Sequence, residues 1–318
     1  MNRPAQTELA NPDTALKSPE KSLSPWSPLA HPIFRALWIA TVASNIGTWM
    51  EDVGESWLMV SLTTSPMRVA LVETAGSLPI VLLALPAGAL ADVVDRRRLL
   101  LITQSWMLVS AAALGLLTLA GVVTPWLLLL LTFTLGLGTA MNGPAFQAIL
   151  PEIVPCQEIP AAVTLTGVAV NVSRAVGPAL GGLLVAAAGP GVVFVLNAIS
   201  FLGVMGVIYR WQRAPQQSTL PPEHVFGAMR AGLRYVRHAP EFFAALVRTA
   251  AFILCASALW ALLPSQTRHA LGLGAFGYGI LLGCIGSGAV TGAAFLPKVR
   301  QKISNNLLVV WATVLFAG

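Results

Sequence analysis

Long apolar segments recur along the whole chain, and they constrain its fold more than any other feature. Two of them, residues 67–91 and 99–121, carry only a few charged side chains. A helix rises about 1.5 Å per residue, so a segment of about 20 residues can cross a bilayer. Charged residues make up only 10% of the chain, too small a share to cover the surface of a soluble protein. We therefore expect an integral membrane protein built of α-helices.

Further segments of the same kind predict a series of membrane helices. The sequence ends about half-way through the last of them, which begins near Asn305. Because a half-crossing would leave backbone groups unsatisfied in lipid, we expect the chain to be C-terminally truncated relative to a longer protein. The complete helices are predicted at residues 34–60, 67–91, 99–121, 125–150, 159–188, 191–211, 241–264 and 271–297.

Two polar stretches interrupt this series. Residues 1–31 are rich in Ser, Pro and charged residues and lack a signal-peptide pattern, which predicts a disordered cytoplasmic tail. Residues 212–240 form a cytoplasmic linker, in which residues 224–238 place apolar side chains along one helical face with arginines beside it. This pattern predicts an amphipathic helix on the membrane surface, and a solvated linker helix is the alternative. The membrane part is thus divided into an N-terminal six-helix half, 32–211, and a partial second half, 241–318.

The basic residues fall almost entirely on one side of this layout. Only Arg68 and Arg268 lie on the other side, while Arg174 lies within a helix. Because Lys and Arg stay on the cytoplasmic side, we expect a multi-pass protein of the plasma (cytoplasmic or inner) membrane with its N-terminus in the cytoplasm. The net charge of +6 does not indicate nucleic-acid binding, since the basic residues lie at the ends of apolar segments and not on one soluble face.

A short polar loop joins the second and third predicted helices. In it a glycine and two aspartates precede three arginines, and the aspartates are short enough to cap a helix or to pair with those arginines. Residues 292–302 follow the eighth helix in the same way and repeat the glycine and basic positions of residues 88–98. Two such halves joined by a basic linker are a known plan of transporters. The loop residues of interest are Gly88, Asp92, Asp95, Arg96, Arg97 and Arg98.

Three segments resemble sequences of the major facilitator superfamily. Residues 88–98 resemble the signature between helices two and three of that superfamily, and residues 173–182 are similar to the Gly-Pro-x-x-Gly-Gly signature of its exporters. Residues 143–155 resemble the branch that contains the enterobactin (siderophore) exporter. The resemblance covers residues 33–318. The chain departs from the family at Phe146, where members usually have Arg, and it has fewer spans than the family.

The resemblance implies a fold, a function and partners. The implied fold is an all-α integral membrane bundle of the major facilitator type, with the N-terminal six-helix half and only the start of the second half. The implied function is secondary active transport, namely proton-coupled export of small organic molecules such as siderophores or drugs by alternating access. The implied partners are a small-molecule substrate, protons as the coupling ion and membrane lipids, without nucleic acid, cofactor or metal. The alternative is a truncated or non-transporting membrane protein with an assembly or regulatory role, which the missing helices favour.

The resemblance also implies a role for the loop 88–98. In the family this loop is a latch on the inner side of the closed cavity. Asp92 would bind a neighbouring helix end, and the arginines would bind lipid phosphates or acidic partners, of which Glu152 is one. The alternative is that the arginines only set topology.

The fifth helix carries the second motif, in which small residues allow a close helix neighbour and a proline bends the helix. These features suit either a junction between two rocking halves or plain helix packing. The motif residues are Ser173, at a position that is commonly Gly, and Gly177, Pro178, Gly181 and Gly182. The eighth helix repeats the small-residue spacing, and we expect it to make the same contact in the other half. The residues of this repeat are Gly279, Gly283, Gly288 and Gly292.

A stripe of polar residues lies along the first predicted helix. Its members, three or four positions apart, are Thr41, Asn45, Thr48, Asp52 and Glu55, so they share one face. We expect this face to line a central cavity, since facing lipid would expose two carboxylates. Glu51 lies about 100° away, and its surroundings are not predicted. The candidate proton or substrate residues are Asn45, Thr48, Asp52, Glu55, Glu73 and Arg174.

Two interpretations of these cavity residues are open. In the first, Asp52 or Glu55 binds and releases a proton during transport, because a carboxylate that moves between apolar and basic surroundings changes its protonation. In the second, the depth of Arg174 in its helix allows a permanent structural ion pair with Asp52 or Glu55.

No residue pattern indicates an enzyme. No His lies within a predicted span, so a base for hydrolysis at membrane depth is lacking. A phosphate-binding Gly-Lys-Ser/Thr loop, which an ATP-driven pump would need, does not occur. The three cysteines, Cys156, Cys255 and Cys284, are scattered and predict neither a disulfide framework nor a metal site.

Overall fold

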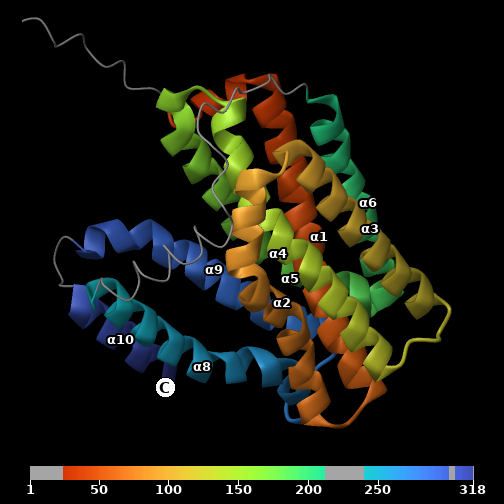
Figure 1. The fold of residues 1–318 in the computed structure, drawn as a ribbon. Helices are drawn as coiled ribbons and strands as arrows, with labels where there is room; N and C mark the ends of the chain where they lie inside the picture. The colour runs from red at the N-terminus through yellow and green to blue at the C-terminus, as the bar shows by residue number, and fades with distance from the viewer. Residues whose placement is uncertain (1–23, 212–239, 301–304, 318) are drawn as a thin grey trace, which may run out of the picture.

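The computed structural model describes residues 24–211, 240–300 and 305–317, and these residues are helical, without strands (Figure 1). The predicted surface helix at 224–238 lies outside the described residues. So do most of the predicted tail, residues 1–23, and Lys302 of the repeated loop.

The described helices follow the apolar segments of the sequence to within a few residues. Several begin at a proline, which has no backbone N–H to lose in the first turn of a helix. They are α1 (Pro32–Leu62), α2 (Pro66–Val93), α3 (Arg96–Leu119), α4 (Pro125–Ile153), α5 (Ile159–Ala188), α6 (Pro190–Arg210), α8 (Pro240–His269), α9 (Ala275–Arg300) and α10 (Asn305–Ala317), with two 3-10 helices, η2 (Ser27–Ala30) and η3 (Cys156–Glu158).

Seven of the described helices are long and apolar enough to span a membrane. The polar stripe lowers the hydropathy of α1, and α10 has only 13 residues, so neither is among the seven. The all-α, multi-pass character predicted from the sequence is thus confirmed.

Helices α1 to α6 form one bundle, in which α1 packs on α5 and α6, α2 on α4, and α3 on α6 (Figure 1). Short connections make successive helices run in opposite directions, so the bundle has two ends. We call the end that holds the start of α1, the α2–α3 and α4–α5 connections and the end of α6 the arginine end, and the opposite one the far end. Separate apolar clusters fill them: Leu37, Leu99, Leu100, Ile149 and Ile208 belong to the arginine end, and Leu58, Met59, Val72, Leu114 and Leu128 to the far end.

The residues just before α1 are packed against the bundle. Leu29 of η2 lies on a cluster that includes Phe34 and Leu165. A nitrogen of the His31 ring lies 2.9 Å from a carboxylate oxygen of Glu158 at the start of α5. The disordered tail that we expect up to residue 31 can therefore extend at most to residue 23.

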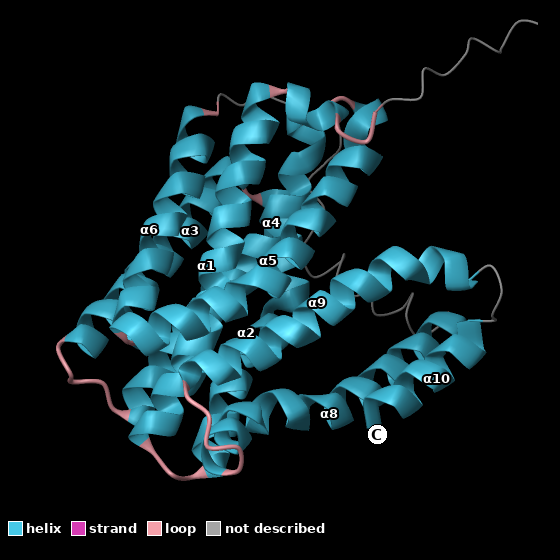
Figure 2. Ribbon diagram, turned by 180° about the vertical axis from the view of Figure 1, so that it is seen from behind, coloured by secondary structure: helices cyan, strands magenta, loops and turns pink. Residues whose placement is uncertain are grey.

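Helices α8 to α10, which we call the second half as distinct from α1 to α6, the first half, leave much of their apolar surface uncovered. In Figures 1 and 2, α9 runs obliquely out of the bundle, and α8 and α10 lie to its side. α9 packs along α5, and α8 packs on α2. Only 6% of the α8 span is buried, against 50% of the α3 span. The contact between the two halves is thus carried mainly by the α5–α9 pair.

Candidate functional site

The arginine loop begins with a helix cap. Asp95 is the N-cap of α3, and its side chain accepts a hydrogen bond of 2.9 Å from the backbone N–H of Arg98. An aspartate in this position satisfies a free N–H group of the first turn. The side chain of Asp92 is outside what the structure describes, so its binding to a neighbouring helix end stays a prediction. Gly88 has open space where a Cβ would point.

Two of the three arginines bind the ends of neighbouring helices. Arg96 Nη1 donates 2.9 Å hydrogen bonds to the carbonyl of Ala148 and to Glu152 Oε1, both in α4. Arg97 Nε donates to the carbonyl of Ile208 at 3.1 Å, and Arg97 Nη2 donates to the next carbonyl, that of Tyr209. The carbonyls in the last turn of a helix have no helical donor, and the negative end of the helix dipole favours a cation there. The loop therefore ties the start of α3 to the ends of α4 and α6.

Arg97→Ala is expected to destabilise the chain, because the last carbonyls of α6 lose two charge-assisted hydrogen bonds. For this partly exposed group we expect a loss of about 1–2 kcal/mol. Thermal unfolding of the purified chain in detergent, followed by size-exclusion chromatography, measures it. Arg98→Ala is the matched control, since the Arg98 side chain is exposed. If both variants melt alike, the arginines set topology alone.

The glycines of α5 bring two neighbours into close contact. A Cβ at Gly177 would lie 2.5 Å from the Cβ of Trp49, and one at Gly181 would lie 2.8 Å from the Cα of Met50, so both glycines face α1. Ser173 is fully buried on the same face and donates a 3.3 Å hydrogen bond to the carbonyl of Val42. These positions hold α5 against α1.

Gly182 faces the second half of the molecule. A Cβ there would lie 2.6 Å from the carbonyl oxygen of Ala275 and 2.8 Å from the Cα of Gly279, both in α9. Gly283 also faces α5, whereas Gly288 has open space. We expected the small residues of α9 to make a separate contact within the other half. Two of them, Gly279 and Gly283, instead contact the α5 motif itself.

Pro178 contributes to the same junction. Proline has no N–H, so the carbonyl of Arg174 lacks the donor that residue 178 would otherwise supply. Gly286 of α9 approaches this carbonyl so closely that a Cβ would lie 2.5 Å from its oxygen. Contacts of a Cα–H group with a carbonyl are common where helices pack tightly. Two residues of the Gly-Pro motif, Pro178 and Gly182, thus form the contact of α5 with α9, while the others hold α5 against α1.

The acidic residues of α1 point in different directions. Glu51 is 4% exposed and faces α6, where Asn197 Nδ2 donates a hydrogen bond to its Oε2. Glu55 is 5% exposed, and its carboxyl lies beside the Thr132 hydroxyl of α4. Asp52 is exposed. Asp52 and Glu55 were predicted to share one face of the helix, but Glu55 lies in the bundle interior and Asp52 points out of it.

Asp52 has a second carboxylate as its neighbour. Glu73 of α2 is exposed and lies close enough to Asp52 for the two charges to interact. Both also lie within electrostatic reach of Tyr278 of α9, whose hydroxyl is beside Ser56. Two of the candidate cavity residues thus lie on the side of the bundle where α9 contacts α1.

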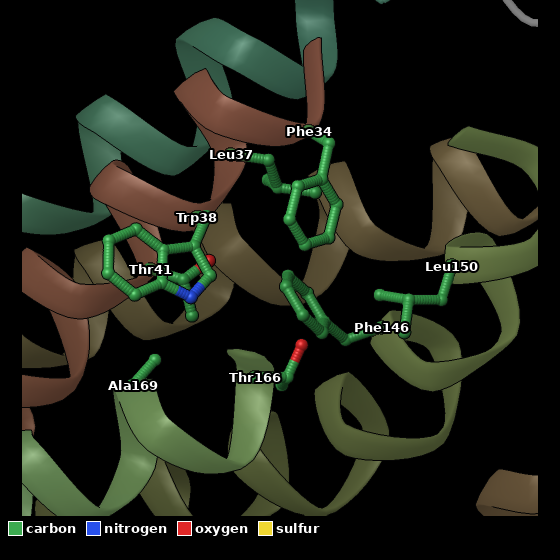
Figure 3. A pocket seen from close by; sticks show the side chains of 8 residues that line it. All are labelled: Phe34, Leu37, Trp38, Thr41, Phe146, Leu150, Thr166 and Ala169. Carbon is green, nitrogen blue, oxygen red and sulfur yellow. The ribbon is translucent and has the colours of Figure 1, made fainter. Parts of the chain in front are cut away.

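The other residues of the stripe lie nearer the arginine end. Asn45 and Thr48 are half-buried, and the Thr48 hydroxyl donates a 3.1 Å hydrogen bond to the Ser44 carbonyl of its own helix. Thr41 lines a small cavity together with aromatic residues of α1 and α4 (Figure 3). The part of this cavity that the centre of a water molecule can occupy is about 10 Å³, which is the minimum needed to hold one water. Phe146, at the position where the family has Arg, faces this apolar cavity, which could not stabilise a charge.

The expected ion pair of Arg174 with Asp52 or Glu55 is wrong. Among the described residues, Arg174 forms an ion pair with neither carboxylate. The Arg174 guanidinium instead lies 5.5 Å above the ring of Trp49. Ser173 is level with Val42 in the α1–α5 contact, which puts Arg174 about two helical turns from Asp52.

The far end joins the two halves through aromatic side chains. Trp57 of α1 stacks on Tyr278 of α9, with 6.3 Å between ring centroids and 24° between planes. The guanidinium of Arg268, at the end of α8, lies 5.8 Å above the Trp57 ring. None of these three residues is among the candidate site residues named from the sequence. Asn197 was missed as well, although it is a polar residue within the apolar segment 191–211.

Comparison with known proteins agrees with this architecture. The profile of the family described as transmembrane secretion effector, of the major facilitator type, matches residues 23–318. A solved bacterial homologue of the human lysosomal transporter Spinster, in an inward-facing and unoccupied conformation, superposes with a TM-score of 0.67 at 14% identity. It covers 90% of this chain and 64% of its own, and at this identity it shows the fold alone.

Two curated relatives are similar in sequence. The staphyloferrin A transporter of Staphylococcus aureus (strain NCTC 8325 / PS 47) is 31% identical over 157 residues, which cover 49% of this chain and 40% of the relative. The enterobactin exporter EntS of Escherichia coli O1:K1 / APEC is 24% identical over 289 residues, which cover 89% of this chain and 68% of the relative. The matched regions thus span 40% to 68% of the length of these relatives. Because the profile of this family matches residues 23–318, the chain belongs to the transmembrane secretion effector family of the major facilitator superfamily.

Proposed function

We propose that this chain works as a secondary active transporter, a proton-coupled exporter of small organic molecules such as siderophores or drugs that operates by alternating access. Its family supports this proposal, and two of its relatives carry the names of a siderophore transporter and a siderophore exporter. The domain division proposed with it is a tail (1–31), a six-helix half (32–211), a linker (212–240) and a partial second half (241–318).

The observation that carries the proposal is the one-ended contact between the halves. Tyr278, Gly279 and Arg268 meet α1 and α5 toward the far end. Beyond Gly286, toward the arginine end, the α9 residues whose side chains are described are exposed or half-buried. In each state of an alternating-access cycle, the two halves are in contact at one end and apart at the other. With the arginine end in the cytoplasm, as the basic residues favour, this state opens inward.

Proton coupling is assigned to the carboxylates of α1. Intramembrane carboxylates are costly and are kept where they bind a proton or a substrate. Glu51, Asp52 and Glu55 make no ion pair with a basic residue of the described chain, so a proton is a suitable partner for them. Movement of α9, which carries Tyr278, would change the surroundings of Asp52 between two conformations.

Asp52→Asn is expected to uncouple transport from the proton gradient. An amide cannot exchange the proton, so export driven by a pH jump should fall at least ten-fold, a change of about 1.4 kcal/mol. Uptake into inverted membrane vesicles that carry the complete protein measures it, while substrate counterflow, which needs no gradient, should persist. Asp52→Glu, which keeps the carboxylate, is the matched control. Undiminished proton-driven export by Asp52→Asn would end this assignment.

The second candidate function is a truncated or non-transporting membrane protein with an assembly or regulatory role. This candidate is favoured because the matched regions cover only 40% to 68% of the length of the two relatives. Reading the gene beyond Gly318 separates the two candidates. Further membrane spans there would support the transporter, and a stop codon would support the second candidate.

A further inference from the structure

We propose that Arg174 of α5, held over the ring of Trp49 of α1, binds the carboxylate group of an organic anion at mid-membrane depth, beside the contact of α5 with α9. The inference rests on the proposed transport function and adds the charge and the chemical class of the substrate.

Arg174 lies deep within a membrane helix. At a rise of about 1.5 Å per residue it is about 22 Å along α5 from Ile159, the first residue of that helix. A charged residue at such a depth is costly, and in membrane proteins it is kept where it has a function. The same depth separates the guanidinium from the lipid phosphates at the arginine end, so a lipid headgroup is not the expected partner.

The guanidinium of Arg174 has hydrogen-bond donors without an acceptor. Its Nε is buried and has no hydrogen-bond partner. Among the described residues, no carboxylate forms an ion pair with Arg174 and no other acceptor binds it. Buried polar groups in proteins are hydrogen-bonded in the great majority, so an exception of this kind points to a ligand. The group that satisfies Arg174 is therefore expected to come from a bound molecule.

Trp49 orients the guanidinium without using these donors. The Cζ atom of Arg174 lies 5.5 Å from the centroid of the Trp49 ring. Such a cation–π contact is electrostatic and takes up no N–H group. Trp49 is itself fixed against α5, since a Cβ at Gly177 would lie 2.5 Å from the Trp49 Cβ. The planar fork of N–H donors thus stays free in a defined place, and it matches the two oxygens of a carboxylate.

Arg174 projects from the side of α5 that is turned away from lipid. Val172 and Val176 are exposed apolar residues, and at 100° per residue they lie on the opposite side of the helix. Gly177 faces α1 and Gly182 faces α9, and Arg174 lies between these two directions. The side chain therefore points into the boundary between the first and the second half.

This boundary is accessible from the arginine end. Gly286 of α9 contacts the carbonyl of Arg174, and beyond it the described α9 side chains are exposed or half-buried. Asn45 and Asn171 are half-buried as well. They lie one helical turn from Trp49 and Arg174, on the side of the arginine end. Polar groups thus continue from Arg174 toward the end at which a substrate would enter.

An organic carboxylate is the ligand that these features select. An unpaired positive charge at membrane depth attracts an anion. The aromatic and apolar surroundings favour an organic body over a hydrated inorganic ion. Asp52, which is one of the carboxylates expected to pair with Arg174, lies about two helical turns away, so it does not occupy the guanidinium.

The test compares probes that share one naphthalene body. Radiolabelled 1-naphthoate, its neutral amide 1-naphthamide and 1-naphthyl phosphate are equilibrated at neutral pH with the purified chain in a neutral detergent. Only binding displaced by excess unlabelled probe is counted. We expect naphthoate to bind about ten-fold more tightly than naphthamide, and more tightly than naphthyl phosphate. Equal binding of naphthoate and naphthamide would overturn the proposal without the use of any variant. Tighter binding of the phosphate would overturn the assignment to a carboxylate.

Variants of Arg174 then locate the site. Arg174→Gln should weaken naphthoate binding about ten-fold and leave naphthamide binding unchanged, so that the preference disappears. Arg174→Lys, which keeps the charge but not the fork, should keep a smaller preference. Arg68→Gln is the matched control, since Arg68 is an exposed arginine in the first turn of α2. Each variant must elute as the unmodified chain does on size-exclusion chromatography. Unchanged naphthoate binding by Arg174→Gln would contradict this site.

Trp49 is expected to act as a positioning residue for Arg174. Trp49→Leu should reduce the preference for naphthoate over naphthamide about 2- to 5-fold, because the guanidinium loses its cation–π contact. Trp49→Phe, which keeps an aromatic face, should restore most of the preference. A general loss of packing would weaken the binding of both probes alike, so the ratio separates the two roles. An unchanged ratio in Trp49→Leu would show that Trp49 does not orient Arg174.

Failure of this inference can be told apart from failure of the proposed function. If the chain prefers naphthoate through Arg174 but the complete protein exports nothing, the transport proposal fails and the carboxylate site remains. If the complete protein exports its substrate and Arg174→Gln leaves that export unchanged, the transport proposal holds and the carboxylate site is wrong.

Discussion

Gly182→Leu is expected to separate α9 from α5 and to shift the chain away from the state with a closed far end. A Cβ at this position meets the backbone of Ala275 and Gly279 at 2.6 and 2.8 Å, and backbone atoms cannot rotate away as a side chain can. Overpacking of this kind costs about 1–3 kcal/mol or more. Under the proposed alternating access this contact belongs to one conformation only, so the cost falls on that state and shifts the equilibrium about 5- to 150-fold.

Labelling of a buried cysteine measures this shift. Val53 of α1 is fully buried and packs with Tyr278 and Leu282 of α9, so Val53→Cys reports departure of α9. The natural cysteines are exposed and are replaced by Ser before labelling with a water-soluble maleimide. Gly167→Leu is the matched control, since Gly167 lies in the same helix with nothing within 4 Å. Equal labelling rates in Gly182→Leu and Gly167→Leu would show that the contact does not hold the halves together.

The helices themselves could be predicted from the sequence. The segments predicted at 34–60 and 125–150 correspond to α1, Pro32–Leu62, and α4, Pro125–Ile153. A run of apolar residues between polar connections determines a membrane helix locally, because every backbone group must be satisfied within the segment. Prolines such as Pro32 would have located the helix starts more closely.

Contacts between distant helices were predicted less well. Periodicity assigns a residue to a face of its own helix, but it does not say which neighbour covers that face or at which level. Arg174 illustrates the second limit, since close packing at Gly177 and Gly181 sets the α1–α5 register and brings Arg174 to Trp49. Glu51 illustrates the first, because its partner Asn197 comes from a helix 146 residues away in sequence.

The arginine loop combines both cases. The Asp95 cap joins residues three positions apart, and the sequence alone indicated it. Glu152 could be named as a partner of the arginines because the sequence places it just after the predicted helix 125–150, on the same side, and Arg96 does bind it. The bonds from Arg97 to the end of α6 cross 111 residues, and only the packing of α3 against α6 brings them together.

Asn197→Ala is expected to be among the most destabilising single changes in the bundle. Asn197 is fully buried, and it is the residue whose amide donates a hydrogen bond to Glu51. Its Oδ1 also accepts a 3.1 Å hydrogen bond from Ser200. Removing the amide takes away the donor of a buried carboxylate and leaves a cavity, so we expect a loss of about 3 kcal/mol, or about 150-fold in the folding equilibrium.

Reversible unfolding of the purified chain in mixed micelles of a mild detergent and dodecyl sulfate measures the loss. Asn171→Ala is the control, because Asn171 donates only to the Gly167 carbonyl of its own helix, at 2.9 Å. A double-mutant cycle with Glu51→Leu separates the hydrogen bond from the cavity. If Glu51 depends on Asn197, the Asn197→Ala change should cost about 1–2 kcal/mol less once the Glu51 carboxyl is gone, since the lost amide then leaves no Glu51 acceptor without its donor. Equal costs in both backgrounds would mean that the cavity alone is responsible and that another group satisfies Glu51.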